Sequence, residues 1–165
     1  MTDVWPPPEA PMAVARRYVR DHHTHASGVS LLRWWRGSFY RWDTTHWREV
    51  ADRTIQAAIY RVLEHADYSG PKGIPAPWDP TRHKVANVAE ALGAIVHISE
   101  YTDPPRWLDG NDGTENLVAL ANGLLDVWTR KVQPCSPLWF NLSALPYDYL
   151  QDPPVPTRWL RFLGE

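Results

Sequence analysis

Three histidines close together in the chain are the first candidate for chemistry. His22, His23 and His25 fall within four consecutive positions, and Asp43 or His46 could complete a ligand set. Imidazole nitrogens bind zinc and similar metals, and a metal held there would support a metal-dependent hydrolase or nuclease. The alternative is a polar helix end with exposed imidazoles. No second block of ligands stands at a diagnostic spacing, so we expect no metal and no other cofactor.

Arginines alternate with aromatic residues in a second group. The run Arg33-Trp34-Trp35-Arg36 is followed closely by Phe39-Tyr40-Arg41-Trp42. In a strand alternate side chains share a face, so Arg33 and Trp35 point one way and Trp34 and Arg36 the other. An exposed face of rings and guanidiniums could stack bases and neutralise phosphates. The alternative is that both faces are buried and the arginine stems cover the rings.

Positive charge is concentrated in the first part of the chain. Residues 14–61 hold nine arginines and four acidic residues, whereas residues 62–165 hold eight basic and thirteen acidic ones, for a net charge of −2 overall. A basic, aromatic first part favours a nucleic-acid surface there. A genome rich in arginine codons would give the same composition with the charges simply solvated.

Several enzyme classes lack their motifs in this sequence. It contains no GxxxxGK[ST], GxGxxG, GxSxG or HExxH, so we expect no ATP hydrolysis and no enzyme activity from the chain on its own. Cys135, the single cysteine, lies between proline and serine residues in an expected loop, which does not favour a Cys-His catalytic pair. The sequence has neither a long apolar run nor a basic-then-apolar leader, so we expect a cytoplasmic protein without a membrane partner.

Periodicity and turn residues predict an α+β fold. A proline-rich tail over residues 1–11, read as a flexible leader, precedes a single domain over residues 12–165. That domain is expected to have a mainly helical body, an N-terminal antiparallel β-meander and a C-terminal β-hairpin. Helices are predicted over residues 12–22, 52–65, 81–98, 114–121 and 157–163, and strands within 29–50 and over 124–132 and 138–142. Arg82 and Lys84 sit at the start of a helix, against the dipole preference, and form a second basic patch.

Ten tryptophans could serve either the core or a contact surface. Those interleaved with arginine are candidates for stacked bases: Trp34, Trp35, Trp42 and Trp47. Three in the acidic part are expected to pack the hairpin and the last helix: Trp128, Trp139 and Trp159. The remaining rings are assigned to neither role.

Three strings late in the chain, in their order, resemble a known domain. They are Asn122-Gly123-Leu124-Leu125-Asp126-Val127-Trp128-Thr129, then Leu145-Pro146-Tyr147-Asp148-Tyr149, and finally Arg158-Trp159-Leu160-Arg161-Phe162-Leu163. Together with the preceding strands and helices they resemble the domain just before the superfamily-three helicase core of phage, plasmid and poxvirus primase–helicases. The resemblance covers residues 13–163, and none of its strings is a catalytic motif.

This resemblance implies an accessory domain that links primase and helicase modules. Implied partners are single-stranded or primer–template DNA, those modules in cis or in trans, and further copies in a hexamer formed with the helicase core. The ATPase core would follow Leu163, so helicase activity is implied only for a longer protein. The alternatives are a purely structural oligomerisation domain, a free-standing regulator of a helicase, and the metal-dependent hydrolase.

The residues expected to bind nucleic acid combine both basic groups. They are Arg33, Trp35, Arg36, Tyr40 and Arg41, with Arg82 and Lys84 as the second patch.

Overall fold

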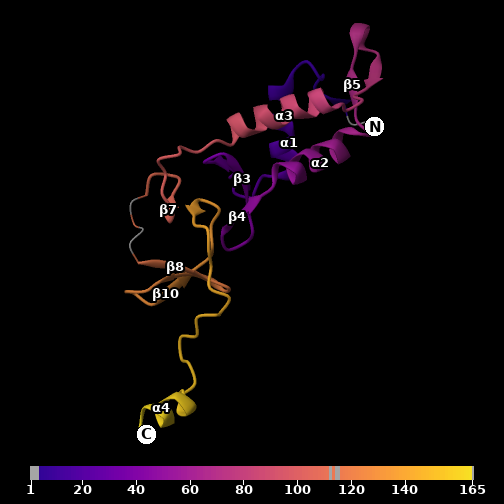
Figure 1. Ribbon diagram of the computed structural model, residues 1–165. Helices are drawn as coiled ribbons and strands as arrows, with labels where there is room; N and C mark the ends of the chain where they lie inside the picture. The colour runs from indigo at the N-terminus through magenta and orange to yellow at the C-terminus, as the bar shows by residue number, and fades with distance from the viewer. Residues whose placement is uncertain (1–3, 112, 114–115, 165) are drawn as a thin grey trace.

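A computed structural model describes residues 4–111, 113 and 116–164 of the chain. Within them, four α-helices and eleven short strands are arranged around four small sheets (Figure 1). The helices are α1 (Pro11–His22), α2 (Asp52–Leu63), α3 (Arg82–Ile95) and α4 (Thr157–Leu163), and a short 3-10 turn, η1, spans Pro71–Gly73. The strands are β1 (Val4–Trp5), β2 (Leu32–Trp35), β3 (Ser38–Trp42), β4 (Trp47–Val50), β5 (Asp67–Ser69), β6 (Pro75–Pro77), β7 (Arg106–Trp107), β8 (Leu117–Leu120), β9 (Gly123–Asp126), β10 (Lys131–Gln133) and β11 (Trp139–Phe140).

The expected layout of a mainly helical body with a meander and a hairpin is wrong. The chain is a mixed α+β fold with about 30% helix, and its strands are spread over the whole described chain. The sheets have the orders β1-β5-β6, β2-β3-β4, β11-β7 and β10-β9-β8. Prolines recur along the sequence and remove backbone donors. They favour short strands and loops where a long helix would otherwise continue.

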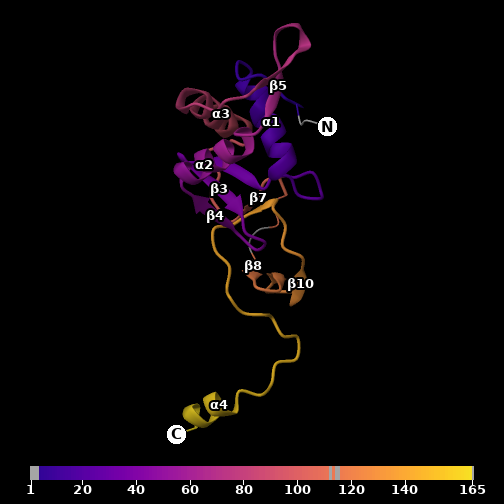
Figure 2. The same cartoon turned by 90° about the vertical axis from the view of Figure 1, so that its right-hand side faces the viewer.

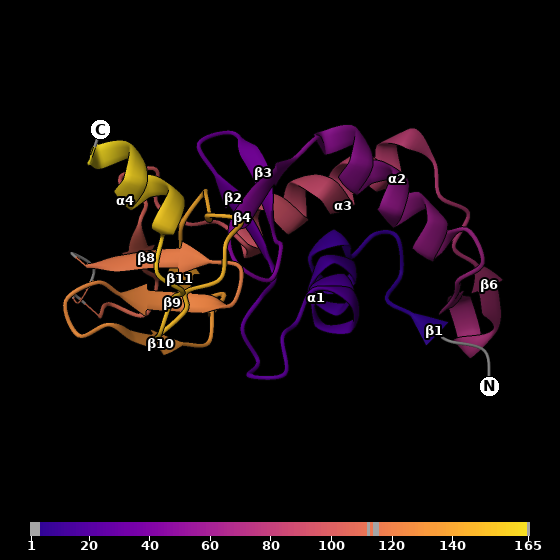
Figure 3. The ribbon, with the colours of Figure 1, turned by 90° about the horizontal axis from the view of Figure 1, so that it is seen from below.

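The β2-β3-β4 sheet is antiparallel, and its two faces contribute to two different cores. Leu32 and Phe39 lie on the face that packs against the helices. Trp35 and Trp47 lie on the opposite face, where they pack with Phe140 from β11. Viewed from below, the sheet lies between helices α1–α3 and the later strands (Figure 3). The two faces follow directly from the two-residue period of a strand.

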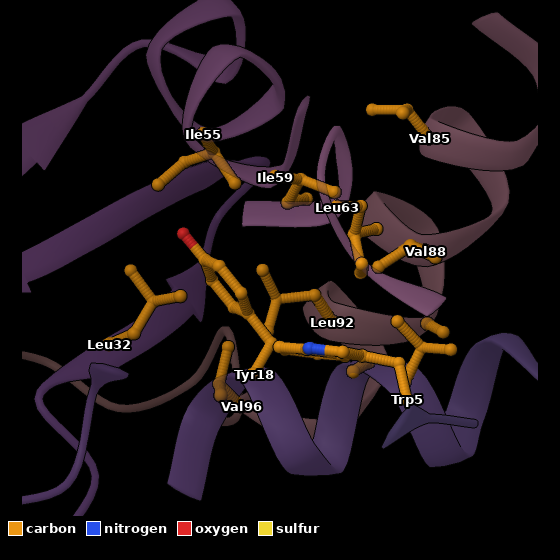
Figure 4. Packing of buried hydrophobic residues seen from close by; sticks show 14 of the residues in the cluster. Trp5, Tyr18, Leu32, Ile55, Ile59, Leu63, Val85, Val88, Leu92 and Val96 are labelled. Carbon is orange, nitrogen blue, oxygen red and sulfur yellow. The ribbon is translucent and has the colours of Figure 1, made fainter. Parts of the chain in front are cut away.

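The larger core is formed by α1, α2 and α3 on one face of that sheet. The helix α2 contributes Ile55, Ile59 and Leu63, which are four residues apart and therefore share one side of the helix. The ring of Tyr18 from α1 lies among them, between Ile55 and Leu32 (Figure 4). Thr81 is the N-cap of helix α3, and its side chain accepts a hydrogen bond from the Lys84 backbone N–H. The helix buries an apolar side of its own in the same core: Val85, Val88, Ala91 and Leu92.

The proline-rich N-terminal segment packs on the domain over its described residues 4–10, which corrects the interpretation of a flexible leader. Strand β1 pairs in parallel with β5, and Trp5 is only 5% exposed. The indole N–H of Trp78 donates to the Pro6 carbonyl oxygen at 3.0 Å. This pairing joins residues more than sixty positions apart, so local sequence patterns do not reveal it. Residues 1–3 lie outside the described part.

The later strands correct two local predictions. Residues 117–120, expected to be helical, form β8, while residues 114 and 115 of that expected helix lie outside the described residues. The strand expected over 124–132 is two strands, β9 and β10, separated by a turn. Gly123 has φ +150°, and a Cβ there would lie 2.5 Å from Val132 Cγ1. Only glycine fits where β10 passes this close to β9.

A proline-rich segment carries α4 away from the rest of the molecule (Figures 1 and 2). No residue of α4 is buried, and its apolar side chains are largely exposed: Trp159, Leu160, Phe162 and Leu163. Trp159, expected to pack the last helix, is 58% exposed and stacks only on Phe162 of its own helix, at a centroid distance of 5.7 Å. None of the helices in the described ranges is long and apolar enough to span a bilayer.

Replacement of Trp5 by alanine tests whether the N-terminal segment belongs to the core. Because its buried ring stacks with His22 and lies under the Arg17 guanidinium at 4.3 Å, we expect Trp5→Ala to lower the free energy of unfolding by about 3–5 kcal/mol. Trp128→Ala is the matched control, since Trp128 is 78% exposed and should cost less than about 0.5 kcal/mol. Urea unfolding measures both, and equal effects would show that residues 4–10 do not support the fold.

Candidate nucleic-acid interface

Trp35 is buried and is not available to stack a base. Its exposed fraction is 5%, and its ring packs edge-on against Tyr40 and Phe140, at centroid distances of 5.6 and 5.3 Å. The indole N–H donates to the Thr102 carbonyl oxygen at 3.0 Å. Trp35 therefore joins the sheet to the segment that follows α3, which corrects its expected role as a stacking residue.

The charge of Arg36 is already paired within the fold. Its guanidinium lies 4.4 Å from the centroid of the Trp35 ring and forms a 2.6 Å ion pair with Asp103. Its Nε–H also donates to the Glu100 carbonyl oxygen at 2.9 Å. Arg36 thus holds the turn of residues 99–103 against the end of β2, and its charge is not free for a phosphate.

Arg33 and Arg41 lie on opposite faces of the sheet. In the β2-β3 register Arg33 pairs with Tyr40 and Leu32 with Arg41, so Arg33 and Tyr40 share one face and Arg41 lies on the other. Tyr40 packs in the cluster with Trp35 and Phe140. Burial, followed by the charge of Glu49, raises the pKa of Tyr40, while Arg36 acts in the opposite direction. The single Arg-aromatic face expected from the sequence does not exist, because that face is part of a core.

Arg41 is exposed and makes no ion pair with any described residue. It stands directly opposite Arg48 in the β3-β4 register, and Arg48 pairs with Asp43 at 2.8 Å. The charges of Arg61 and Arg41 both act on the buried Tyr18 hydroxyl, whose pKa is raised mainly by burial. Arg61 was not among the expected site residues, and only the fold brings it into electrostatic reach of this group.

The two cations of the second basic patch differ in their contacts with the described residues. Lys84 donates to the carbonyl oxygens of Trp78 and Asp79, each at 2.9 Å, and its ammonium lies 5.5 Å from the centroid of the Trp78 ring. The lysine thereby closes the loop before α3. Arg82 is exposed and has no ion pair among the described residues. The cost of placing the Lys84 charge at the start of the helix dipole is offset by its contacts with the Trp78 and Asp79 carbonyl groups. No ligand is needed to explain this position.

The three histidines do not assemble a metal site. His22 stacks on Trp5, with a centroid distance of 6.5 Å, while the His25 Nδ1 hydrogen-bonds the Ser27 hydroxyl at 2.8 Å. Across residues 4–111, 113 and 116–164 no group of three or more potential ligands lies in position to hold a metal ion. The fold therefore does not bring His22, His23 and His25 together as ligands of one metal ion.

The Cys135 thiol is half-buried, and burial raises its pKa. A catalytic or redox-active cysteine needs the opposite shift, toward the thiolate. This agrees with a structural role for the side chain beside the small cluster around Trp139.

The turn between β9 and β10 displays an aromatic ring beside two cations. Trp128 is 78% exposed, which corrects its expected role in packing, and Arg130 and Lys131 are exposed next to it. The Asp126 carboxylate accepts hydrogen bonds from the backbone N–H groups of Trp128 and Thr129, at 2.9 and 3.0 Å. These bonds, chiefly the one from Thr129, lower the pKa of Asp126 and hold the turn in shape.

The sequence contains a signal for this turn, inside the strand expected over residues 124–132. Asp126 followed by Thr129 is a typical side-chain-capped turn, and the exposed ring lies inside it. We name the side chains of Trp128, Arg130 and Lys131 the hairpin tip. It combines the residue types expected to bind nucleic acid, but in the net-acidic part of the chain.

Comparison with protein-family models and with curated proteins finds no match for this chain.

Substitutions at neighbouring positions of α3 separate the two members of the second patch. Lys84→Met removes two charge-assisted hydrogen bonds to backbone carbonyls, so we expect the free energy of unfolding to fall by about 1–3 kcal/mol. Arg82→Ala removes an exposed charge and should change it by less than about 0.5 kcal/mol. Thermal or urea unfolding compares the two variants, and an unaffected Lys84→Met would rule out the structural role of Lys84.

His23 makes the stability of the fold depend on pH. Burial, with the charges of His22 and Arg41, lowers its pKa from 6.5 to about 4. Between these values the unfolded chain binds a proton that the folded chain does not, so the free energy of unfolding falls as the pH drops from 6.5 toward 4. We expect His23→Gln to flatten this dependence in urea unfolding. His25→Gln removes a histidine from the same loop and should leave this pH dependence unchanged. Equal slopes of unfolding free energy against pH in the two variants would contradict the role of His23.

Proposed function

We propose that this chain is a non-catalytic DNA-binding and assembly module of a mobile-element replication primase–helicase, acting in the cytoplasm between the primase and helicase modules. The observation that carries the proposal is the hairpin tip. The string from Asn122 to Thr129, which carries much of the resemblance to such modules, folds into the β9 strand and the turn that exposes Trp128. An exposed ring followed in the chain by two exposed cations can stack a base and contact the adjacent phosphates.

The mode of binding differs from the one expected from the sequence. The rings of β2–β4 are buried or half-buried in two cores, so that sheet offers no stacking platform. In this mode the Trp128 ring stacks on a base, while Arg130, Lys131 and Arg41 supply positive charge for the phosphates. Contacts of this kind read the backbone and the faces of bases, and they bind single strands with little sequence preference.

A specific observation supports the assembly part of the proposal. The helix α4 stands on a proline-rich arm away from the other elements (Figure 2), and none of its described residues belongs to a buried cluster. An isolated helix of seven residues is marginal in water. Burial of these side chains against a helicase module, in cis or in trans, would stabilise the helix and connect the two parts. A purely structural module is the second candidate function, and it requires no contribution from the hairpin tip.

Fluorescence anisotropy with single-stranded oligothymidylate distinguishes these two functions. We expect the chain to bind the oligonucleotide with an affinity that falls as the salt concentration rises. Trp128→Ala should weaken the binding free energy by about 1–3 kcal/mol, because one stacked base is lost. Each of three further variants should lose one phosphate contact, and each should reduce the slope of log K against log salt by about 0.7. These variants are Arg130→Ala, Lys131→Ala and Arg41→Ala.

Matched controls come from α4, which lies far from the tip in both side views. Trp159→Ala and Arg158→Ala remove an exposed ring and an exposed charge and should leave the DNA affinity unchanged. Absence of binding at low salt, or equal losses in the control and tip variants, would reject the DNA-binding role and leave the structural one.

A further inference from the structure

A pocket of ≈ 350 Å³ lies on the opposite side of the β2-β3-β4 sheet from Arg41. Two arginines and two hydroxyl side chains line it, namely Arg33, Arg106, Ser99 and Thr102, and Trp107 contributes an aromatic wall. Neither Asp nor Glu belongs to its lining within the described ranges. Donors and positive charge therefore dominate this pocket.

The partly buried side chain of Arg33 belongs to the lining of this pocket. Its Nε is buried and has no hydrogen-bond partner among the described residues, and the guanidinium lies 5.7 Å from the centroid of the Trp47 ring. Burial lowers the pKa of Arg33, which is the direction expected when the charge has lost water. A guanidinium that is partly withdrawn from water and forms no ion pair with a described residue is unfavourable, and an anion in the pocket would offset that cost.

Surrounding contacts hold the pocket in shape. The turn that carries Ser99 and Thr102 is fixed from one side by the Trp35 indole, which donates to the Thr102 carbonyl oxygen at 3.0 Å. Arg36 fixes it from the other side through the Glu100 carbonyl and the Asp103 carboxylate. The Ser99 hydroxyl also accepts a hydrogen bond from the Tyr101 backbone N–H at 3.3 Å.

The opposite wall is equally constrained. Arg106 and Trp107 form β7, which pairs with β11. The Trp107 ring packs against Trp139 at a centroid distance of 5.0 Å, and its indole N–H donates to the Gly113 carbonyl oxygen at 3.3 Å. The pocket is thus lined by residues whose backbones are set by the fold, a requirement for tight recognition of a small ligand.

We propose that this pocket binds a phosphomonoester group, either of a free nucleotide or at the 5′ end of a DNA strand. A phosphomonoester carries nearly two negative charges and three acceptor oxygens, which two guanidiniums and two hydroxyls can satisfy together. A carboxylate has a single charge and two oxygens, and it would leave donors unused. The proposal is independent of the hairpin tip, because the two sites share no residue.

Isothermal titration calorimetry with thymidine 5′-monophosphate and with thymidine tests the phosphate requirement. We expect the nucleotide to bind at least about tenfold more tightly than the nucleoside, a difference of about 1.4 kcal/mol. Arg106→Ala, at an exposed position, should remove this difference, and Arg33→Met should do the same. Arg158→Ala is the matched control and should retain it. Equal affinities for nucleotide and nucleoside, or full binding by Arg106→Ala, would overturn the proposal.

Arg33→Met also has a readout that does not depend on a ligand. Because the Arg33 Nε is buried and has no hydrogen-bond partner among the described residues, we expect the variant to unfold at the same or a higher urea concentration than the parent chain. If it fails to fold, Arg106→Ala still decides the binding experiment.

Oligothymidylates with and without a 5′ phosphate identify the source of the group. Preference for the phosphorylated strand by roughly tenfold, lost in Arg106→Ala, assigns the pocket to a strand end. Binding of the mononucleotide without such a preference assigns it to a free nucleotide. Salt-dependent binding of the unphosphorylated strand without any binding of the mononucleotide would overturn this inference and leave the proposed function intact. Binding of the mononucleotide without any binding of the unphosphorylated strand would overturn the proposed DNA-binding role and leave this inference intact.

Discussion

Burial of the β2-β3-β4 sheet on both faces is the constraint on which the rest of the structure depends. A sheet with a single buried face alternates apolar with polar residues, whereas this one carries buried or half-buried rings on both faces and leaves Arg41, Arg48 and Glu49 exposed. The helices cover the face with Leu32 and Phe39, and Phe140 closes the cluster on the other face with Trp47, which is 1% exposed. The sheet is the middle layer of the molecule, and removal of either covering layer would expose large rings.

Arginine is suited to the edges of such a layer. Its stem covers aromatic surface while its guanidinium reaches water or a partner, as Arg36 does over Trp35. The result is that the cations of the first part of the chain are distributed over both faces rather than gathered on one. Arg41 lies on the helix side and Arg33 lies in the pocket on the other side, so two separate electropositive sites are possible where the sequence suggested one.

The sequence predicted well those elements whose own periodicity is strong. The apolar spacing of α2 and α3 and the strands near residues 32–50 are local patterns, and they are present in the structure. The site could not be predicted in the same way, because strand alternation identifies two faces but not whether both are covered. The cover comes from Phe140 and from the turn of residues 99–103, which are far away in the chain. Secondary structure cannot be predicted from short apolar runs for a related reason. Residues 117–120 fit a helix or a strand, and pairing with β9 decides between the two.

The distribution of the tryptophans narrows the way in which this chain could contact DNA. Of the ten rings, only Trp128 and Trp159 are mostly exposed, and both lie in the net-acidic part of the chain. A stacking surface built from the arginine-rich strands would require Trp35 or Trp47 to leave a core, at a cost greater than one stacked base returns. Trp128 incurs no such cost, because its turn is stabilised by Asp126 and its ring is already in water. The excess of tryptophan is therefore mainly a property of the three buried clusters, and the proposed stacking would use a single ring that the β9–β10 turn exposes.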